Sequence, residues 1–243
     1  MSIVIPAYNE AESITDTIAA IEQAFMVEPI DHEILVINDN SKDQTRAVLT
    51  DLCQKYPNLR FETNNGPNGF GYAVRYGLER FTGDCVAIMM ADLSDSPADL
   101  IHFYRTMVTG NYDCVFGSRF MRNSKLTDYP KLKMIINRLA NLTIRVVMNI
   151  KYNDTTNAFK LYKRHTIDGL KPFLSPHFNL TIELPLKAII RGYSYTVLPN
   201  SWTNRKYGKS KLSLREMGSR YFFILMYCFI EKYFSKGDFQ KKW

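Results

Sequence analysis

The sequence has few cysteines and histidines, and neither type is spaced as a metal site or a disulfide scaffold would require. Its four cysteines include no CxxC pair, and its four histidines are scattered. Because most of the cysteines lie in apolar or helical surroundings, we expect them to be buried, reduced thiols in a cytosolic protein. They are Cys53, Cys85, Cys114 and Cys228.

The sequence also lacks an apolar run long enough to span a bilayer, which takes about 20 residues. Its strongest candidate, residues 221–230, is about half that length and ends at Glu231-Lys232. We find no internal repeat, no low-complexity linker and no signal peptide, since an apolar strand, Ser2–Ile5, opens the chain. With 243 residues, 46% of them hydrophobic, the chain suits one globular domain with or without an appendage.

Acidic residues are scarce near the C-terminus. Residues 200–243 hold ten lysines and arginines against three acids, so this segment accounts for the whole net charge of +7. Such asymmetry indicates an anionic partner, which could be a phosphate ligand, an acidic membrane surface or nucleic acid. A basic tail that only promotes solubility is the alternative.

The apolar run at residues 221–230 lies inside this basic segment. Its flanks carry Arg215, Arg220, Lys232 and Lys236. An apolar, aromatic helix with basic flanks is typical of one that lies in a membrane interface. The alternative is a helix docked on the protein's own core or at a dimer interface.

Apolar runs and helical periodicity alternate through residues 1–118, which predicts βαβ units and a mostly parallel sheet. After Ser118 we expect a long helix, roughly Leu132–Met148, and another near Ile182–Arg191, in an elaborated second half of one α/β domain. The expected strands are Ser2–Ile5, Glu33–Ile37, Leu59–Thr63, Val86–Ala91 and Asp113–Gly117, and the expected helices between them cover residues 14–25, 43–55, 71–81 and 97–109.

Asp92 directly follows the apolar run Val86–Ala91 and precedes Ser94. Ligands of open α/β sheets bind beyond the carboxyl ends of such strands, and oxygen ligands of this kind suit Mg²⁺ or Mn²⁺. The stretch Ser96-Pro97-Ala98-Asp99 resembles an N-cap, an N1 proline and a capping-box acid. A helix start explains that stretch but not Asp92, which we therefore interpret as a ligand-site residue.

Polar loops also follow the first two expected strands, and their side chains should share one crevice. In these loops, Asp39 offers a carboxylate for a base or a ribose, and Tyr8 offers a ring for stacking. The glycine-rich stretch 68–73 opens a helix but lacks the spacing of a phosphate-binding loop. Its glycines could serve only to permit close packing.

These segments, together with Gly117-Ser118-Arg119-Phe120 and the basic stretch 205–211, resemble family 2 glycosyltransferases over nearly the whole chain. The late Arg-x-x-Gly-x-Ser-Lys motif is similar to that of the polyprenyl-phosphate sugar synthases, the subgroup of dolichyl-phosphate mannose synthase. The resemblance implies a GT-A (Rossmann-like), mostly parallel sheet with flanking helices and C-terminal amphipathic interfacial helices.

The activity that this resemblance implies is inverting sugar transfer from a nucleotide-diphosphate sugar to a polyisoprenyl phosphate, such as dolichyl or undecaprenyl phosphate, with Mg²⁺ or Mn²⁺. GDP-mannose is the default donor, while UDP-glucose, UDP-galactose and UDP-N-acetylglucosamine stay open. The implied location is peripheral, on the cytoplasmic face of a membrane, without a nucleic-acid partner. The implied parts are a nucleotide-sugar half (1–120), an acceptor-side half (121–211) and a membrane-interface segment (212–243).

Position by position, the resemblance assigns roles to individual residues. The catalytic residues are Asp92, Arg119, Arg205 and Lys211, and Asp92 and Ser94 are the metal ligands. The nucleotide contacts are Pro6, Tyr8, Glu10 and Asp39. The phosphate or acceptor contacts are Lys133, Ser210 and Glu183, and the segment 154–160 is similar to one that lines the acceptor side. A structural role for Glu183, such as orienting a lysine or arginine of the basic loop, is the alternative.

Three positions depart from the family pattern. Asn38 and Asn40 replace an acid and a glycine beside Asp39, and Met90 replaces the first acid of the Asp-x-Asp motif. Because a thioether does not bind a hard cation as a carboxylate does, a metal would depend on Asp92, Ser94, waters and the donor diphosphate.

Two alternative functions stay open. A soluble family 2 enzyme acting on a polysaccharide or protein hydroxyl would usually need an acidic general base, which a phosphate acceptor does not. A non-catalytic nucleotide-sugar binder is suggested by Met90, but the retention of Asp92 and Arg119 argues against it.

Overall fold

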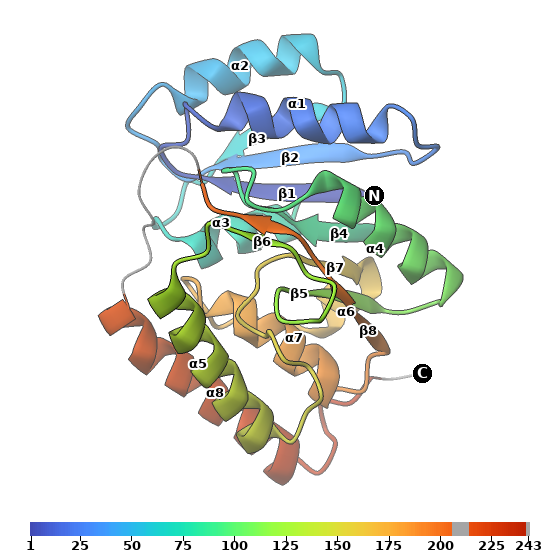
Figure 1. The fold of residues 1–243 in the computed structure, drawn as a ribbon, viewed down its shortest axis with the longest axis vertical. Helices are drawn as coiled ribbons and strands as arrows, with labels where there is room; N and C mark the ends of the chain where they lie inside the picture. Colours follow the sequence, from blue (N-terminus) through green and yellow to red (C-terminus); the bar gives the residue numbers. More distant parts are fainter. Residues whose placement is uncertain (206–213, 242–243) are drawn as a thin grey trace.

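The structure, a computed structural model, describes residues 1–205 and 214–241. Its centre is a seven-stranded sheet in the order β3-β2-β1-β4-β7-β5-β8 (Figure 1). Only β7 runs antiparallel to its neighbours, so the sheet is mostly parallel, as predicted. The strands are β1 (Ser2–Ala7), β2 (Glu33–Asn38), β3 (Leu59–Thr63), β4 (Cys85–Ile88), β5 (Cys114–Ser118), β7 (Lys160–Lys163) and β8 (Tyr195–Pro199).

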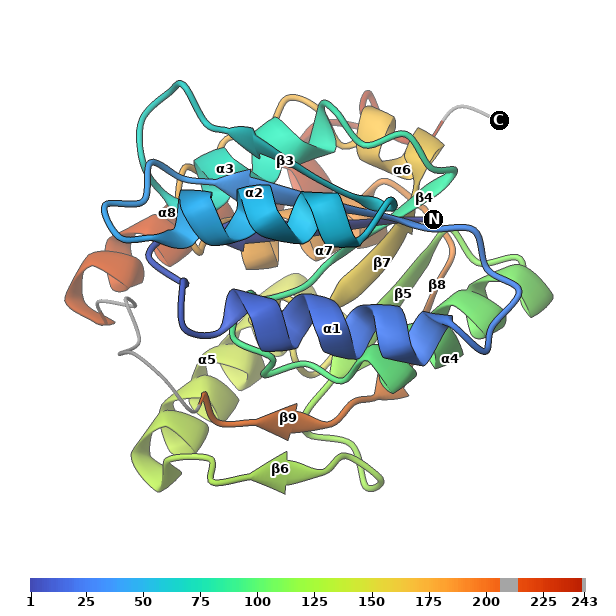
Figure 2. The same cartoon turned by 90° about the horizontal axis from the view of Figure 1, so that it is seen from above.

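Helices cover both faces of this sheet (Figures 1 and 2). One face packs on α1 (Ile14–Phe25), α2 (Thr45–Lys55) and α4 (Pro97–Thr109). The other packs on α3 (Phe70–Leu78), α6 (Arg164–Gly169) and α7 (Leu180–Ile190).

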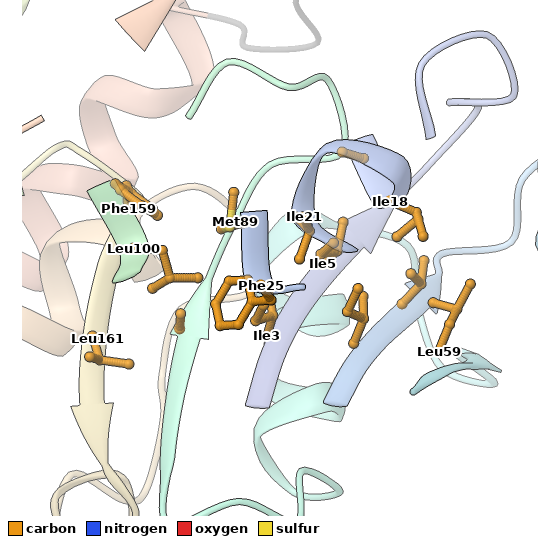
Figure 3. Close-up of a cluster of buried hydrophobic side chains, with 14 of the residues drawn as sticks. Ile3, Ile5, Ile18, Ile21, Phe25, Leu59, Met89, Leu100, Phe159 and Leu161 are labelled. Carbon is orange, nitrogen blue, oxygen red and sulfur yellow. The ribbon is translucent and has the colours of Figure 1, made fainter. Parts of the chain in front are cut away.

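Side chains of β1 show why this arrangement needs continuous apolar runs. Successive residues of a strand point to opposite faces, so a strand covered on both sides is apolar throughout. Ile3 and Ile5 pack against α1 (Figure 3), whereas Val4 lies in the opposite cluster with α3. All three side chains are fully buried.

The elements that we did not predict lie in the second half of the chain. They include β7, α6, β8 and a two-stranded parallel ribbon of β6 (Leu126–Thr127) and β9 (Trp202–Thr203), seen at the lower edge of Figure 2. The strand β7 begins and ends with a lysine, Lys160 and Lys163. Because lysine is rarely found in a core, the sequence did not indicate a buried strand here.

Two long helices, α5 (Lys131–Met148) and α8 (Leu214–Phe234), lie side by side at one end of the molecule (Figure 1). Ile144 of α5 and Ile224 of α8 share a third core cluster with α7. A buried ion pair, Arg191–Glu231, joins α8 to the end of α7 at 2.6 Å between Nε and Oε1. The C-terminal helix is therefore docked on the protein's own core, the alternative raised by the sequence, although it also keeps an exposed apolar face.

Two further expectations concern cysteines and membrane spans. All four cysteines are free, and only Cys53 is not buried, which confirms unpaired thiols. Within residues 1–205 and 214–241, no helix combines the length and the apolarity that crossing a membrane requires.

Candidate active site

A cavity of about 650 Å³ opens at the carboxyl ends of β1, β2, β4 and β5, where the sequence predicted a ligand crevice. Residues of α5 and α8 complete its wall. The predicted site residues on this wall are Pro6, Tyr8, Glu10, Asp39, Asp92, Ser94, Arg119, Lys133 and Arg205. Ser210 and Lys211 fall outside the described residues, and Glu183 does not reach the wall.

Asp39 is positioned by the glycine-rich stretch. Its carboxylate accepts hydrogen bonds from the Asn64 side chain and from the backbone N–H of Gly69, both at 2.8 Å. Asn40 has φ of 58°, in the left-handed region that asparagine tolerates better than most residues. The Gly-to-Asn departure from the family pattern is therefore compatible with the same turn.

The glycines after Asp39 permit close packing. A Cβ on Gly71 would lie 2.5 Å from the carbonyl oxygen of Ser175, so only glycine fits there without a shift. Phe70 stacks on Phe178 with ring centroids 4.4 Å apart, and the backbone N–H of Tyr72 donates to Pro176. The stretch brings the start of α3 against the segment that carries Phe178 on the cavity wall, in keeping with the packing interpretation.

Asp92 faces a cation of the chain itself. Arg205 Nη2 donates to Asp92 Oδ2 at 2.5 Å, and Arg205 Nη1 lies 3.7 Å from Glu10 Oε1. The hydroxyl and backbone N–H of Ser94 both donate to Asp92 Oδ1. Leu93 between them has φ of 54°, a conformation that is uncommon outside glycine and marks a constrained loop.

Asp92 and Ser94, the two side chains expected to bind a divalent cation, are therefore in contact with each other, but they supply few oxygen ligands. Among the described residues, no group of three or more acids, histidines or cysteines is arranged to hold a metal. Asp92 and Ser94 fit a hard cation only as part of a set completed by diphosphate oxygens and water. Asp95 also lines the cavity and is 3% exposed, and burial and then the charge of Asp92 raise its pKa to about 7.

Arg119 forms a buried, bidentate pair with Asp154, a residue that the sequence analysis placed only within a segment. The two side chains meet at 2.9 Å (Nε–Oδ2) and 2.8 Å (Nη2–Oδ1), and the backbone N–H of Arg119 donates to the same carboxylate. Burial alone would lower the pKa of Arg119, but Asp154 raises it above its ordinary value. The guanidinium is thus fixed in place and permanently charged.

Lys133 is a further cation on this wall. Burial, followed by the charges of Arg119 and Arg205, lowers its pKa. Among the described residues, no carboxylate lies within ion-pair distance of its amine, which sits 5.3 Å from the ring centre of Trp202. Three cations that repel one another across a cavity favour a ligand with more than one negative charge.

Glu183 does not line the cavity and has structural contacts instead, the alternative that the sequence left open. It is fully buried, and its carboxylate accepts the backbone N–H groups of Leu174 and Ser175 and pairs with Lys187 at 2.6 Å. It holds the segment that leads to Phe178 on the wall. The sequence could not separate these roles, because both need an acid at the same position.

Lys160 is another residue to which the sequence assigned no individual role. It links two segments that line the cavity. Its buried amine donates to the carbonyl oxygens of Thr155, Asn157 and Thr181, which joins the 154–158 segment to α7. Burial lowers its pKa from an ordinary 10.5 to about 7.

We expect this lysine to make stability depend on pH. Because the pKa is lower in the folded state, the unfolded chain binds the extra proton between about pH 7 and 10.5, and stability rises with pH across that window. Relative to Lys160→Met, the wild type should gain up to about 1.4 kcal/mol per pH unit in urea unfolding at pH 7, 8 and 9. Parallel pH profiles for the two proteins would contradict the expectation.

With this geometry in view, comparisons with known proteins are informative. The family profile described as Glycosyl transferase family 2 matches residues 2–170. The chain is 27% identical over 218 residues to a dolichol-phosphate mannosyltransferase of Pyrococcus furiosus, covering 87% of this chain and 59% of the relative. It is 28% identical over 219 residues to a polyprenol monophosphomannose synthase of Mycolicibacterium smegmatis, covering 87% and 80%. The chain thus spans less than two thirds of the Pyrococcus relative.

Solved structures show the same fold at lower identity. A glucosyl-3-phosphoglycerate synthase from Mycobacterium tuberculosis, solved with UDP, superposes with a TM-score of 0.69 at 16% identity, covering 95% of this chain and 79% of that one. Other structures of that enzyme hold UDP with Mg²⁺, or UDP-glucose with Mn²⁺.

Proposed function

The chain belongs to glycosyl transferase family 2, and on this premise we propose that it transfers a sugar from a nucleotide-diphosphate sugar to a polyisoprenyl phosphate. Two relatives that cover most of this chain are named for mannose transfer to a dolichol or polyprenol phosphate. GDP-mannose is accordingly the donor that we propose first.

One observation carries this proposal. Arg119, Lys133 and Arg205 meet on the same cavity wall, close enough that the first and last lower the pKa of Lys133. A donor diphosphate and a phosphate acceptor bring two polyanions together, and clustered cations offset that repulsion. A hydroxyl acceptor would usually need an acidic general base, and the pairing of Asp92 and Glu10 with Arg205 makes these two carboxylates poorly suited to that role.

The side chains of the wall suit a single displacement at the sugar's anomeric carbon. Asp92 and Ser94 would hold a divalent cation together with the diphosphate, and such a cation neutralises charge on the leaving group. Arg119 and Arg205 would bind the departing phosphate oxygens. The acceptor phosphate, a monoester with a second pKa of about 6, is mostly dianionic at neutral pH and attacks without a strong base. One displacement inverts the anomeric configuration.

A donor panel with one lipid acceptor tests the proposal. We expect radiolabel from GDP-mannose to pass to a polyprenyl phosphate, with less or none from UDP-glucose, UDP-galactose and UDP-N-acetylglucosamine. Transfer to a plain sugar hydroxyl in place of the lipid would identify the soluble-enzyme alternative. Donor binding without any product would identify a nucleotide-sugar binder.

A membrane surface is the second partner in this proposal, and α5 and α8 both support it. Each helix exposes large apolar side chains, most of them more than half accessible. On α5 these recur at helical spacing, and that helix has four cations and no acid, a pattern typical of helices on anionic membranes. The exposed residues are Leu132, Ile135, Leu139, Leu142 and Val146 on α5, and Phe222, Phe223, Met226, Ile230, Tyr233 and Phe234 on α8.

The apolar stripe of α5 gives a prediction that does not disturb the core. Leu139→Gln/Leu142→Gln keeps the charge and the helix propensity, so the protein should fold normally. Loss of two apolar side chains from the lipid interface should weaken binding to anionic vesicles at least about tenfold in co-sedimentation.

The matched control is Met26→Gln/Val27→Gln, at the end of α1, where both side chains are about four-fifths exposed. It should bind vesicles like the wild type. Equal binding by both double variants would show that α5 does not contact the membrane. A change in particle size by gel filtration, with vesicle binding unaltered, would identify a second copy of the chain as the occupant of this face.

A further inference from the structure

One oxygen of the Asp92 carboxylate is bonded to a cation of the chain itself. Arg205 Nη2 lies 2.5 Å from Asp92 Oδ2, and both residues line the cavity. We propose that Arg205 competes with the divalent cation for Asp92, and that the donor diphosphate ends this competition by binding the guanidinium in place of the carboxylate. This inference rests on the proposed nucleotide-sugar donor and concerns how metal binding and donor binding are coupled at that site.

The Asp92 carboxylate has little room for two cations. Its other oxygen, Oδ1, accepts the backbone N–H and the hydroxyl of Ser94. With Arg205 on Oδ2, three hydrogen bonds use most of the roughly four lone-pair positions of a carboxylate. A divalent cation on the same carboxylate meets the positive guanidinium at short range, and two positive groups repel each other strongly away from bulk water.

Burial strengthens this repulsion. The side chains of Asp92 and Arg205 are 6% and 17% exposed. Glu10, whose Oε1 lies 3.7 Å from Arg205 Nη1, is 12% exposed. Water and salt screen such charges less than they screen charges on an open surface. The guanidinium therefore neutralises two carboxylates at once, and a divalent cation without its nucleotide binds weakly, because it has to displace the guanidinium.

The backbone before Arg205 is fixed relative to the Asp92 loop. The strand β9 lies against that loop, because the backbone N–H of Thr203 donates to the carbonyl oxygen of Ser94 at 3.0 Å. On its other side β9 pairs with β6. The exchange of partners is thus made by the long side chain of Arg205, while β9 stays in place.

The donor diphosphate supplies what both cations need. Its oxygens add hard ligands for the metal, and its negative charge replaces Asp92 as the partner of the guanidinium, whose planar fork matches phosphate oxygens. Metal and donor therefore bind cooperatively. By linkage, the factor by which the donor tightens metal binding equals the factor by which the metal tightens donor binding.

The test measures Mn²⁺ binding by electron paramagnetic resonance without nucleotide. We expect Arg205→Gln to bind Mn²⁺ about 10- to 100-fold more tightly than the wild type, because a charge-assisted hydrogen bond no longer has to be broken. Arg205→Lys keeps the charge but loses the guanidinium and should show a smaller gain. The matched control is Arg105→Gln, since Arg105 pairs with Glu28 at the same 2.5 Å outside the cavity, and it should bind Mn²⁺ like the wild type.

A second variant separates competition for Asp92 from a general change of charge. Lys133→Gln removes a cation from the same wall, one that has no carboxylate within ion-pair distance among the described residues. Its gain in Mn²⁺ affinity should be much smaller than that of Arg205→Gln. Equal gains in these two variants would overturn the inference, and so would the absence of any gain in both Arg205→Gln and Arg205→Lys.

Calorimetric titration with GDP gives a second readout. Saturating Mn²⁺ should tighten GDP binding to the wild type, and in Arg205→Gln this tightening should be about 10- to 100-fold smaller. Equal tightening in both proteins would show that Arg205 does not exchange partners. Failure of the proposed function looks different, because the wild type would then transfer no sugar to a polyprenyl phosphate, whereas the Mn²⁺ comparison needs no acceptor.

Discussion

We expect Asp92→Asn to lower kcat for sugar transfer about 100- to 1,000-fold, the range found when one electrostatic stabiliser of a transition state is removed. The substitution keeps an oxygen for the Ser94 hydrogen bonds but removes the charge that faces Arg205. It should also weaken Mn²⁺ binding in the presence of the nucleoside diphosphate, measured by electron paramagnetic resonance.

Asp51→Asn is the matched control, because Asp51 is exposed on α2 and does not line the cavity. It should keep wild-type turnover and Mn²⁺ binding. Full activity of Asp92→Asn, or of the wild type in excess chelator, would show that neither this carboxylate nor a divalent cation is needed. The thermal melting curve of each variant establishes that the fold is intact.

We expect the largest loss of stability from Asp154→Asn. This change leaves the Arg119 guanidinium buried without its bidentate carboxylate, and breaking one side of a buried pair costs about 3–5 kcal/mol. For a chain of this size, about 1 kcal/mol lowers the melting temperature by about 2–4 °C, so a fall of about 6–20 °C should appear in calorimetry.

Glu62→Gln supplies the comparison, since it breaks ion pairs with Arg60 at 2.7 Å and with Arg80 at 3.2 Å, and all three side chains are about one-third exposed. Surface pairs of this kind are worth about 0–1 kcal/mol. If the two variants melt at the same temperature, the Arg119–Asp154 pair does not stabilise the fold as its burial suggests.

The sequence brought residues to the right cavity where their position depends on the order of local elements. The loops after β1, β2 and β4 do converge on one cavity, because the carboxyl ends of parallel strands meet at one edge of a sheet. Asp39, Asp92 and Arg119 could therefore be placed together from the sequence. Glu183 could not be placed, because whether an acid faces a cavity or caps the backbone N–H groups of residues 174 and 175 depends on long-range packing.

The second half of the chain also separates what the sequence predicts from what packing decides. The periodicity of α5 was visible, with Leu139 and Leu142 on one stripe, and such a stripe ordinarily predicts a face turned to the core. Here the faces of the sheet are already covered by α1, α2, α4, α3, α6 and α7, so the stripe remains exposed. A single sequence shows that a helix has an apolar face but not what that face contacts.

By itself, the sequence determined the first five strands of the sheet, the helices between them and the polar loops at the strand ends, because continuous apolar runs and 3.6-residue periodicity are local properties of the chain. The tertiary structure alone decided which charges are neutralised and which remain. Arg119 meets Asp154 across 35 residues, Lys160 is buried, and Lys133 lies near enough to Arg119 and Arg205 for their charges to lower its pKa. Charge compensation depends on distance and burial in space, which no local pattern records.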